Sequence, residues 1–159
     1  MILSIDPGAR SGWAVSDPRL SGSIDHERAA AEDWWADRAP RGMMTAWANF
    51  SKEERLKRVL GTYARWLEGL AKYFKPEIIV LERQKPFRGR AGTNVVEFRG
   101  ASLAVIGKLD LAFVEVGPDQ WRKLLAGRPY DPAKDHELAA EVMLEWWAAI
   151  RSGRLEAAE

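Results

Sequence analysis

The stretch ILSIDPGARSGWAV (residues 2–15) decides the predicted fold, because it places an acidic residue directly after an apolar run. We predict a hairpin of two strands over residues 1–16, since a turn signal separates two short apolar segments. Asp6 ends the first strand, and Pro7 and Gly8 turn the chain at once. A carboxylate at the end of a buried strand is costly to remove from water unless other groups pair with it. The rest of the sequence must therefore supply partners for Asp6.

Beyond the hairpin, the pattern of apolar residues predicts alternating helices and strands. Ser51-Lys52-Glu53-Glu54 is a capping box, in which the first and last residues satisfy each other's backbone N–H groups at the start of a helix. Residues 21–23 indicate a turn, and one more short strand is expected within residues 24–50. Helices are predicted over 51–74, 94–107, about 120–125 and 132–151, and strands over 77–81 and 111–116. This order predicts a single domain over residues 1–159 with a mixed α/β fold, in which antiparallel hairpin strands are extended by parallel crossovers and flanked by helices.

Composition restricts the kinds of site that the chain can form. The 159 residues carry a formal net charge of +1, and 47% of them are hydrophobic, which is typical of a globular domain. No apolar run approaches the length of about 18 residues that a membrane span needs, so we expect a cytoplasmic protein with no membrane partner. The absence of cysteine excludes disulfides and thiolate zinc sites. A bound metal would need oxygen or histidine ligands, and His26 and His136 are the two histidines, so Mg²⁺ or Mn²⁺ is favoured.

Two more carboxylates are predicted to lie near Asp6. Glu82 directly follows the strand 77–81, and parallel neighbouring strands end at one edge of an α/β sheet, where ligands bind. On the last predicted helix, Asp135 projects onto the apolar face near the helix start, with His136 beside it. Each residue alone has another interpretation: a turn cap for Asp6, a salt bridge with an arginine for Glu82, helix-dipole stabilisation for Asp135 and a surface position for His136.

Three inward-facing carboxylates would repel one another unless cations neutralise them. We therefore predict that Asp6, Glu82 and Asp135 bind two Mg²⁺ or Mn²⁺ ions, and that His136 belongs to the same catalytic site. Two such ions about 4 Å apart can activate a water molecule and stabilise the leaving oxygen in phosphodiester hydrolysis. The other acids of this helix form a separate stripe that we expect to face solvent: Glu137, Glu141 and Glu145.

Several segments resemble the motifs of RuvC-type Holliday junction resolvases. Ile5-Asp6-Pro7-Gly8-Ala9-Arg10-Ser11-Gly12-Trp13 resembles the first motif of that family, an apolar strand followed by Asp-Pro-Gly and then Ser or Thr, Gly and an aromatic residue. Val80-Leu81-Glu82-Arg83-Gln84 resembles the second motif, an apolar strand that ends in Glu. Phe98-Arg99-Gly100 is similar to the start of the family's central helix. Val116-Gly117-Pro118 and Trp121-Arg122-Lys123 together are similar to the family's segment of a strand, a proline and a basic helix. The resemblance spans nearly the whole chain and is poorest over residues 20–50.

The resemblance implies an RNase H-like fold and a homodimer. It also implies symmetric nicking of four-way DNA junctions that depends on Mg²⁺ or Mn²⁺. Such an enzyme would act in the cytoplasm of a bacterial cell and be encoded by the host or by a phage. Asp6 and Glu82 match the first two catalytic carboxylates of the family. The last motif differs, because the family has Asp or His followed three residues later by Asp and then Ala. Here His136 aligns with the first position and Ala139 with the expected Asp. The last ligand is therefore left open among Asp135, His136 and Glu141.

A basic loop next to Glu82 is the predicted DNA contact. Its cations can bind phosphates, and an aromatic side chain among them can stack on an unpaired base. The resemblance places a junction-probing aromatic residue in this loop, and Phe87 is the matching residue. The predicted DNA-binding residues are Arg83, Lys85, Phe87, Arg88 and Arg90 in the loop, together with Arg99, Arg122 and Lys123. A solvated loop without DNA contact is the alternative interpretation.

The main prediction is thus a structure-specific DNA endonuclease with branched DNA as its partner. One alternative is part of an actin-like or sugar-kinase-like ATPase, since Asp-x-Gly after a first strand also occurs there. Such proteins need a second domain and a further glycine-rich phosphate loop, and we find neither in this sequence. Another alternative is a non-catalytic DNA-binding module with the same fold. Two symmetric nicks require two active sites, so we expect a dimer formed through helix 94–107 or helix 51–74.

Overall fold

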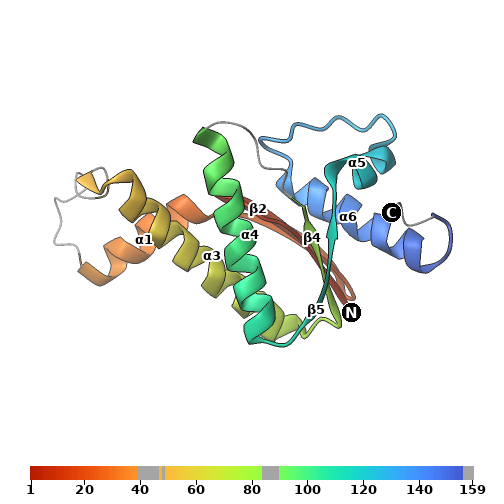
Figure 1. The fold of residues 1–159 in the computed structure, drawn as a ribbon, viewed down its shortest axis with the longest axis horizontal. Coiled ribbons are helices and arrows are strands. Elements are labelled where there is room, and N and C mark those ends of the chain that lie inside the picture. Colours follow the sequence, from red (N-terminus) through yellow and green to blue (C-terminus); the bar gives the residue numbers. More distant parts are fainter. Residues whose placement is uncertain (39–46, 48, 84–89, 156–159) are drawn as a thin grey trace.

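Five strands form one mixed sheet at the centre of the molecule. The computed structural model describes residues 1–38, 47, 49–83 and 90–155. The strands are β1 (Ile2–Asp6), β2 (Arg10–Ser16), β3 (Arg19–Asp25), β4 (Ile78–Glu82) and β5 (Ala112–Val116), and they lie in the order β3-β2-β1-β4-β5. The pairs β1–β2 and β2–β3 are antiparallel, whereas β1–β4 and β4–β5 are parallel. The predicted combination of antiparallel hairpin strands and parallel crossovers is therefore confirmed (Figure 1).

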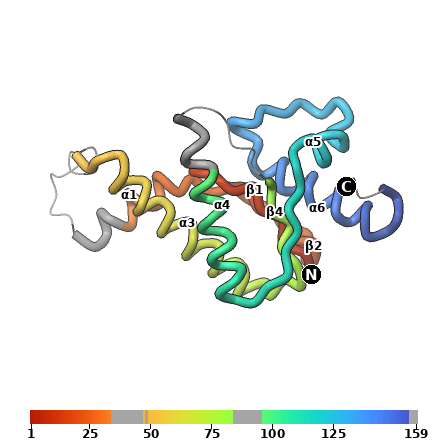
Figure 2. Tube along the Cα trace, in the orientation of Figure 1, coloured from red at the N-terminus to blue at the C-terminus, as the bar shows by residue number. Residues whose placement is uncertain are grey.

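Helices cover both faces of this sheet. The helices α1 (His26–Arg38), α3 (Lys52–Phe74) and α4 (Arg90–Lys108) lie on one face, and α6 (His136–Arg151) lies on the other. The short α5 (Pro118–Trp121) and the 3₁₀ helix η1 (Arg122–Leu125) follow β5 and contact α6. The trace in Figure 2 shows this separation, with α6 across the sheet from α3 and α4. Within the described part of the chain, no helix is long and apolar enough to cross a membrane.

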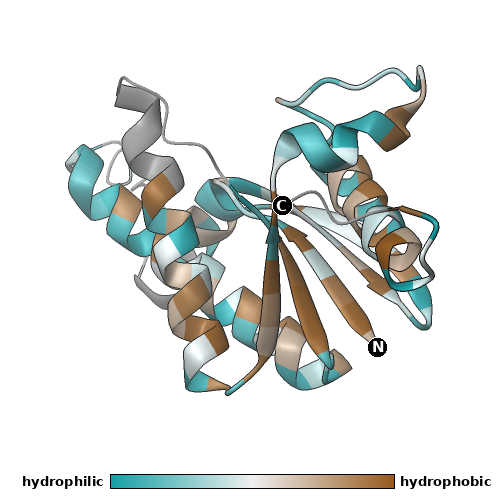
Figure 3. Cartoon of the chain, turned by 45° about the vertical axis from the view of Figure 1, so that its right-hand side comes forward, coloured by the Kyte–Doolittle hydropathy of each residue, from teal (hydrophilic) through white to brown (hydrophobic). Residues whose placement is uncertain are grey.

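The two faces of the sheet build two hydrophobic clusters. Alternate residues of a strand point to opposite faces, so Leu3 and Ile5 pack with the α3 residues Tyr63 and Leu67, all fully buried. On the other face, Ile2, Ala14, Val80 and Val116 pack against α6. The strands β1 and β4 are consequently buried on both faces. The hydropathy colouring of Figure 3 shows mostly hydrophobic residues along the central strands of the sheet. This arrangement fixes the end of β1, with Asp6, next to the end of β4, with Glu82.

Helix α3 begins and ends where its capping residues predict. Ser51 Oγ accepts a hydrogen bond from the backbone N–H of Glu54 at 3.2 Å, and the Glu54 carboxylate accepts from the backbone N–H of Ser51 at 2.9 Å. The capping box read from the sequence is thus confirmed. Lys75 closes the helix in the left-handed conformation, with φ of 49° and its N–H bonded to the Ala71 carbonyl.

The prediction for residues 21–23 was wrong, because they lie inside β3 and not in a turn. The third strand runs from Arg19 to Asp25, earlier than the expected range of 24–50. Gly22 gives the reason for the misreading. It lies opposite Trp13, and a Cβ atom at this position would be 2.8 Å from the indole Nε1 of Trp13. The glycine therefore makes room for a cross-strand ring and does not turn the chain.

The prediction for the last helix was also partly wrong, because α6 begins at His136 and not at residue 132. Residues 131–135 instead form a closed turn. The Asp131 carboxylate accepts from the Ala133 N–H at 2.9 Å, and the Asp135 carboxylate accepts from the Asp131 N–H at 2.7 Å. Because aspartate side chains bond readily to nearby backbone N–H groups, these two residues favour the turn over a further turn of helix.

The acidic stripe of α6 faces solvent only in part: Glu137 is exposed as predicted, whereas Glu141 and Glu145 are half-buried. Ser21 Oγ lies 2.8 Å from a Glu137 carboxylate oxygen and 2.5 Å from one of Glu141, so its single proton bonds to this pair of acids. Arg19 pairs with Glu145 at 2.8 Å. These contacts bind α6 to β3, a strand whose position the sequence did not reveal. The stripe therefore contributes to the packing of α6 on the sheet.

Candidate active site

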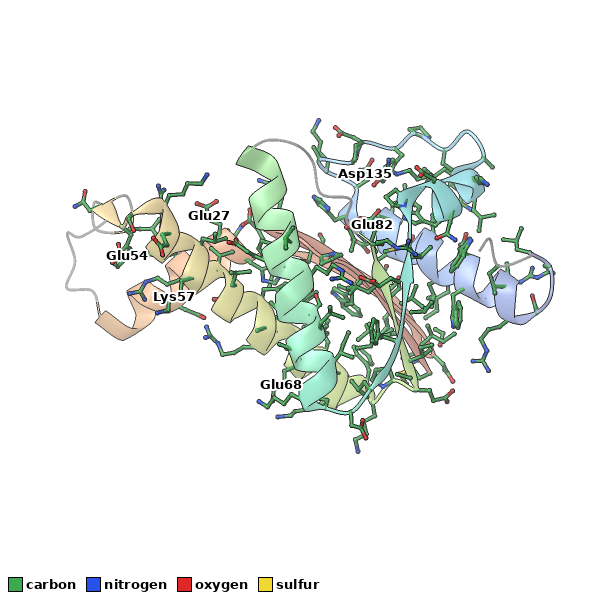
Figure 4. All side chains as sticks on the ribbon, viewed as in Figure 1. Glu27, Glu54, Lys57, Glu68, Glu82 and Asp135 are labelled. Carbon is green, nitrogen blue, oxygen red and sulfur yellow. The ribbon has the colours of Figure 1, made fainter. Side chains whose placement is uncertain are left out.

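Asp6 and Glu82 come together at the carboxyl ends of two neighbouring parallel strands. Ile5 on β1 pairs with Leu81 on β4, so the next residue of each strand is an acid. Only 7% of Asp6 and 8% of Glu82 is exposed. Both carboxylates line a cleft of about 480 Å³, whose other walls are Pro7, Gly8, Ala9, Arg10, Arg122, Tyr130, Pro132, Ala133 and His136. Figure 4 labels Glu82 at this edge of the sheet. The predicted convergence of two carboxylates is present in the structure.

Burial beside a second acid makes Glu82 hold its proton unusually tightly. Loss of hydration, together with the nearby Asp6 carboxylate, raises the pKa of the Glu82 carboxyl to about 8. A pair of carboxyl groups in this state resists carrying two negative charges. A cation between or beside them would relieve the repulsion, so the pair is suited to bind one.

His136 reaches the same cleft from the first residue of α6. Its Nδ1 lies 2.8 Å from Asp6 Oδ2, and this hydrogen bond raises the pKa of the imidazole above its usual value. Gly12 makes the contact possible. A Cβ atom at Gly12 would lie 1.7 Å from the His136 carbonyl oxygen, so only glycine lets the start of α6 approach β2 this closely.

A buried indole bonds to the second carboxylate. Trp121, at the end of α5, is fully buried and donates from Nε1 to Glu82 Oε1 at 3.1 Å. Its ring meets the Tyr130 ring edge-on, with centroids 5.5 Å apart. The Arg122 guanidinium lies 5.4 Å from the Trp121 ring and 5.5 Å from the Tyr130 ring. The two aromatic rings therefore hold a cation at the wall of the cleft.

Sequence reasoning missed Trp121 and Tyr130 as parts of the site. Burial and the nearby charges of Asp6 and Glu82 raise the pKa of the Tyr130 hydroxyl to about 12, so it stays protonated. The signal for Trp121 was a tryptophan directly before a basic pair, on a helix that starts with proline. No comparable signal marks Tyr130, because it lies in an irregular segment far along the chain.

The structure brings His136 to the cleft, but not Asp135. The Asp135 carboxylate bonds back to the Asp131 N–H and is not among the residues that line the cleft. Glu141 accepts from Ser21 on β3. Of the three residues left open for the last ligand, His136 is the one beside Asp6.

His26, the other histidine, is buried against the loop that follows Asp6 and does not line the cleft. Ser11 Oγ donates to the Gly8 carbonyl at 3.0 Å, and His26 Nε2 lies 3.1 Å from that hydroxyl oxygen. Its ring packs edge-on against Tyr63 and Trp66. Burial lowers the pKa of His26 to about 4, so the ring is neutral at pH 7. It supports the loop and does not serve as a ligand.

The predicted DNA-binding residues lie in different surroundings. Arg122 lines the cleft, and Arg83 and Lys123 are exposed. Arg99 forms two hydrogen bonds with Glu115, at 2.6 and 2.9 Å. Lys85, Phe87 and Arg88 lie outside the described residues, and of Arg90 only the backbone, at the start of α4, is described.

The donor set fits a hard divalent cation in part. Among the described residues, no group of three or more acidic or histidine side chains is arranged around a common metal position. Mg²⁺ keeps several water ligands and takes one or two carboxylates together with substrate phosphate oxygens. Asp6 and Glu82 supply the two carboxylates, and their mutual repulsion favours a cation.

Comparisons with known proteins bear on the fold. No protein-family model matches the chain, and no curated protein does. Among solved structures, T. thermophilus RuvC in complex with Holliday junction substrate matches with a TM-score of 0.65 and 16% sequence identity, over 96% of each chain. A structure of Thermus thermophilus RuvC matches with a TM-score of 0.61 and 17% identity, again over 96% of each chain. The fold is that of RuvC. The RNase H-like, RuvC-type fold that the motifs predicted is therefore confirmed.

Within this RuvC fold, the cleft combines four chemical elements. Two buried carboxyl groups can hold a cation, an imidazole beside one of them can carry a proton, an arginine can bind a phosphate, and a tyrosine hydroxyl can donate a hydrogen bond. Such a set suits the binding and hydrolysis of a phosphodiester.

Proposed function

We propose that the chain is a structure-specific DNA endonuclease that resolves four-way junctions by metal-dependent, symmetric nicking. The supporting observation is the pair of buried carboxylates at the ends of two adjacent parallel strands in a RuvC fold. One solved RuvC structure of this fold is a complex with a Holliday junction substrate. Branched DNA is therefore the proposed substrate, and the cytoplasm of a bacterial cell is the proposed location.

Asp6 and Glu82 would hold the metal, which is proposed to be Mg²⁺ or Mn²⁺, with two ions per site. When bound, the metal supplies an activated water and stabilises the leaving oxygen. Trp121 orients Glu82 through its indole N–H, and His136 orients Asp6 through Nδ1. The hydrogen bond to Asp6 raises the pKa of the imidazole, which favours a proton on His136 beside the cleft. Asp135 is not included in this ligand set, because its carboxylate caps the turn before α6.

The cations around the cleft are the proposed DNA contacts. Arg122 lies beside two aromatic rings and would bind the phosphate next to the carboxylates. Arg83 and Lys123 are exposed and would bind phosphates farther along the strand. Lys85, Phe87, Arg88 and Arg90 complete the proposed contact. Arg99 would have to exchange its bond with Glu115 for one with phosphate, so we expect the smallest contribution from it.

A second copy of the chain is part of the proposal, because symmetric nicking requires two active sites. Val96 on α4 is 55% exposed and Phe113 on β5 is 45% exposed. Apolar side chains in such positions are candidates for burial between two copies, consistent with the expectation for helix 94–107.

One gel experiment tests the function. A labelled four-way junction and a plain duplex are incubated with Mg²⁺, Mn²⁺ or a chelator. We expect nicks in the junction only with a metal. The Asp6→Asn variant should lose nicking and retain binding, because it removes one negative ligand and keeps the shape of the side chain. Glu53→Gln, at an exposed site on α3, is the matched control and should cut normally. Full cleavage by Asp6→Asn would refute the role of Asp6, and binding without metal-dependent cleavage would indicate a non-catalytic module.

A further inference from the structure

A second cavity lies on the other side of the loop that follows Asp6. It has a volume of about 270 Å³ and is lined by Ala9, Glu27, Lys52, Arg55, Leu56, Val59 and Phe98. Ala9 also lines the carboxylate cleft, so the two cavities share one wall. Figure 4 labels Glu27 between α1 and α3, apart from Glu82. The second cavity is therefore a neighbour of the cleft and not a part of it.

The second cavity has an apolar base and a charged rim. Phe98 is 1% exposed and Val59 is 5% exposed, and Leu56 on α3 is half-buried beside them. Lys52 and Arg55 stand on the rim, where Lys52 is exposed and Arg55 is half-buried. A ligand with a flat or apolar part and an anionic part would satisfy both surfaces.

The two rim cations differ from many others on this protein. Among the described residues, neither the Lys52 nor the Arg55 side chain forms an ion pair or a hydrogen bond. In contrast, Lys72 and Lys108 both bond to Glu68, and Arg99 bonds to Glu115. A half-buried arginine without a carboxylate partner is available to bind an external anion.

We propose that this second cavity binds one nucleotide of the DNA strand that passes the carboxylate cleft. Lys52 and Arg55 bind its phosphate, and the base or sugar rests on Leu56, Val59 and Phe98. Glu27 on the same rim repels phosphate and can accept a hydrogen bond from an amino group of the base, so the phosphate lies on the α3 side. The inference rests on the proposed function for its ligand. The same chemistry would also accept a free nucleoside monophosphate.

The test compares two double variants that remove the same charge. Lys52→Gln with Arg55→Gln removes the rim cations, and Lys72→Gln with Lys108→Gln removes two exposed cations that already have a carboxylate partner. Binding of a labelled four-way junction and of a labelled single strand is measured by fluorescence anisotropy in chelator, at several salt concentrations. We expect the rim variant to bind DNA about tenfold more weakly. The slope of log affinity against log salt concentration should fall by an amount that corresponds to about 1 to 2 phosphate contacts. The control should show little change in either quantity.

A third variant tests the cavity without changing the charge. Leu56→Trp would fill the space above Phe98 and should weaken binding of both DNAs while the protein remains folded by circular dichroism. Equal losses in the two double variants would overturn the proposal, because they would indicate a general effect of charge. Unchanged binding by the rim variant or by Leu56→Trp would also overturn it.

A titration of the wild-type protein with deoxyadenosine monophosphate, followed by NMR, separates this inference from the proposed function. If deoxyadenosine monophosphate changes the chemical shifts of Leu56 and Val59 but the protein binds no DNA, the DNA endonuclease is refuted and a nucleotide site is retained. Junction binding that does not depend on Lys52 and Arg55 would retain the endonuclease and refute the second site. Absence of binding to either ligand would refute both.

Discussion

Glu82 determines the electrostatics of the cleft, because it is buried next to another carboxylate and has an indole N–H as its donor. The unfolded chain releases the Glu82 proton near pH 4.5, whereas the folded protein keeps it until about pH 8. Between these values the folded state binds more protons than the unfolded state, so this group makes stability fall as pH rises. The raised pKa of His136 acts in the same direction. The stabilisation of the fold by protonated His136 is complete below pH 6.5 and is lost as pH rises through the pKa that His136 has in the folded protein.

A neutral substitution at Glu82 should therefore stabilise the metal-free protein at high pH. We expect the free energy of unfolding of Glu82→Gln to exceed that of the wild type by an amount on the order of a few kcal/mol at pH 8. The reason is that one pKa unit corresponds to about 1.4 kcal/mol. The difference should vanish below about pH 4.5, where the wild-type carboxyl is protonated in both states. Urea unfolding of both proteins from pH 4 to pH 9 measures this difference. A constant difference across that range would contradict the assignment.

Trp121 offers a second test at this scale. Trp121→Phe keeps a ring for Arg122 to rest on and removes the N–H that bonds to Glu82. We expect a loss of about 1.5–3 kcal/mol in stabilisation of the ionised Glu82, because hydrogen bonds to charged groups have that magnitude. Metal affinity measured by calorimetry should fall, whereas junction binding in chelator should not. Arg122→Lys is the converse control, with weaker DNA binding and unchanged metal affinity.

Among the elements, the start of α6 illustrates what the sequence reveals and what it conceals. The strands β1 and β4 and their terminal acids were predicted, because an unbroken apolar run followed by an acid is a local pattern. His136 was also predicted at the site, but the choice between Asp135 and His136 stayed open in the sequence, because it depends on where α6 begins. Asp131 and Asp135 form a turn through backbone contacts that helical periodicity does not show, and His136 then becomes the first helical residue.

Gly12 controls how closely α6 approaches the sheet, and a single methyl group tests this. Gly12→Ala should destabilise the protein by about 3 kcal/mol or more, since the new Cβ would overlap the His136 carbonyl. It should also separate His136 from Asp6 and lower the pKa of the imidazole, which NMR titration measures. Gly69→Ala on α3 is the control, because nothing lies within 4 Å of its added Cβ. It should stabilise the helix by about 0.5–1 kcal/mol.

For the whole molecule, the proposed metal site is coupled to the stability of the fold. A divalent ion that binds only the folded state at about 100 times its Kd adds about 2.7 kcal/mol. For a chain of this size, Tm should rise by about 5–10 °C. Differential scanning fluorimetry with Mg²⁺ or Mn²⁺ against chelator measures the rise. It should be absent in Asp6→Asn and in Glu82→Gln and present in Glu53→Gln. An equal rise in all of them would place the ion elsewhere.

The pairing of β1 with β4 has a consequence for how this protein acquires activity. Asp6 and Glu82 belong to strands that are adjacent in space but separated along the chain by the β2–β3 hairpin strands, α1 and α3. Contacts between such distant segments form late in folding, after the entropy of closing the intervening loop has been lost. Local hairpins and helices can form earlier without assembling the carboxylate pair. A partly synthesised or partly unfolded chain would therefore lack the carboxylate cleft, and the nuclease activity that we propose would appear only with the complete native sheet.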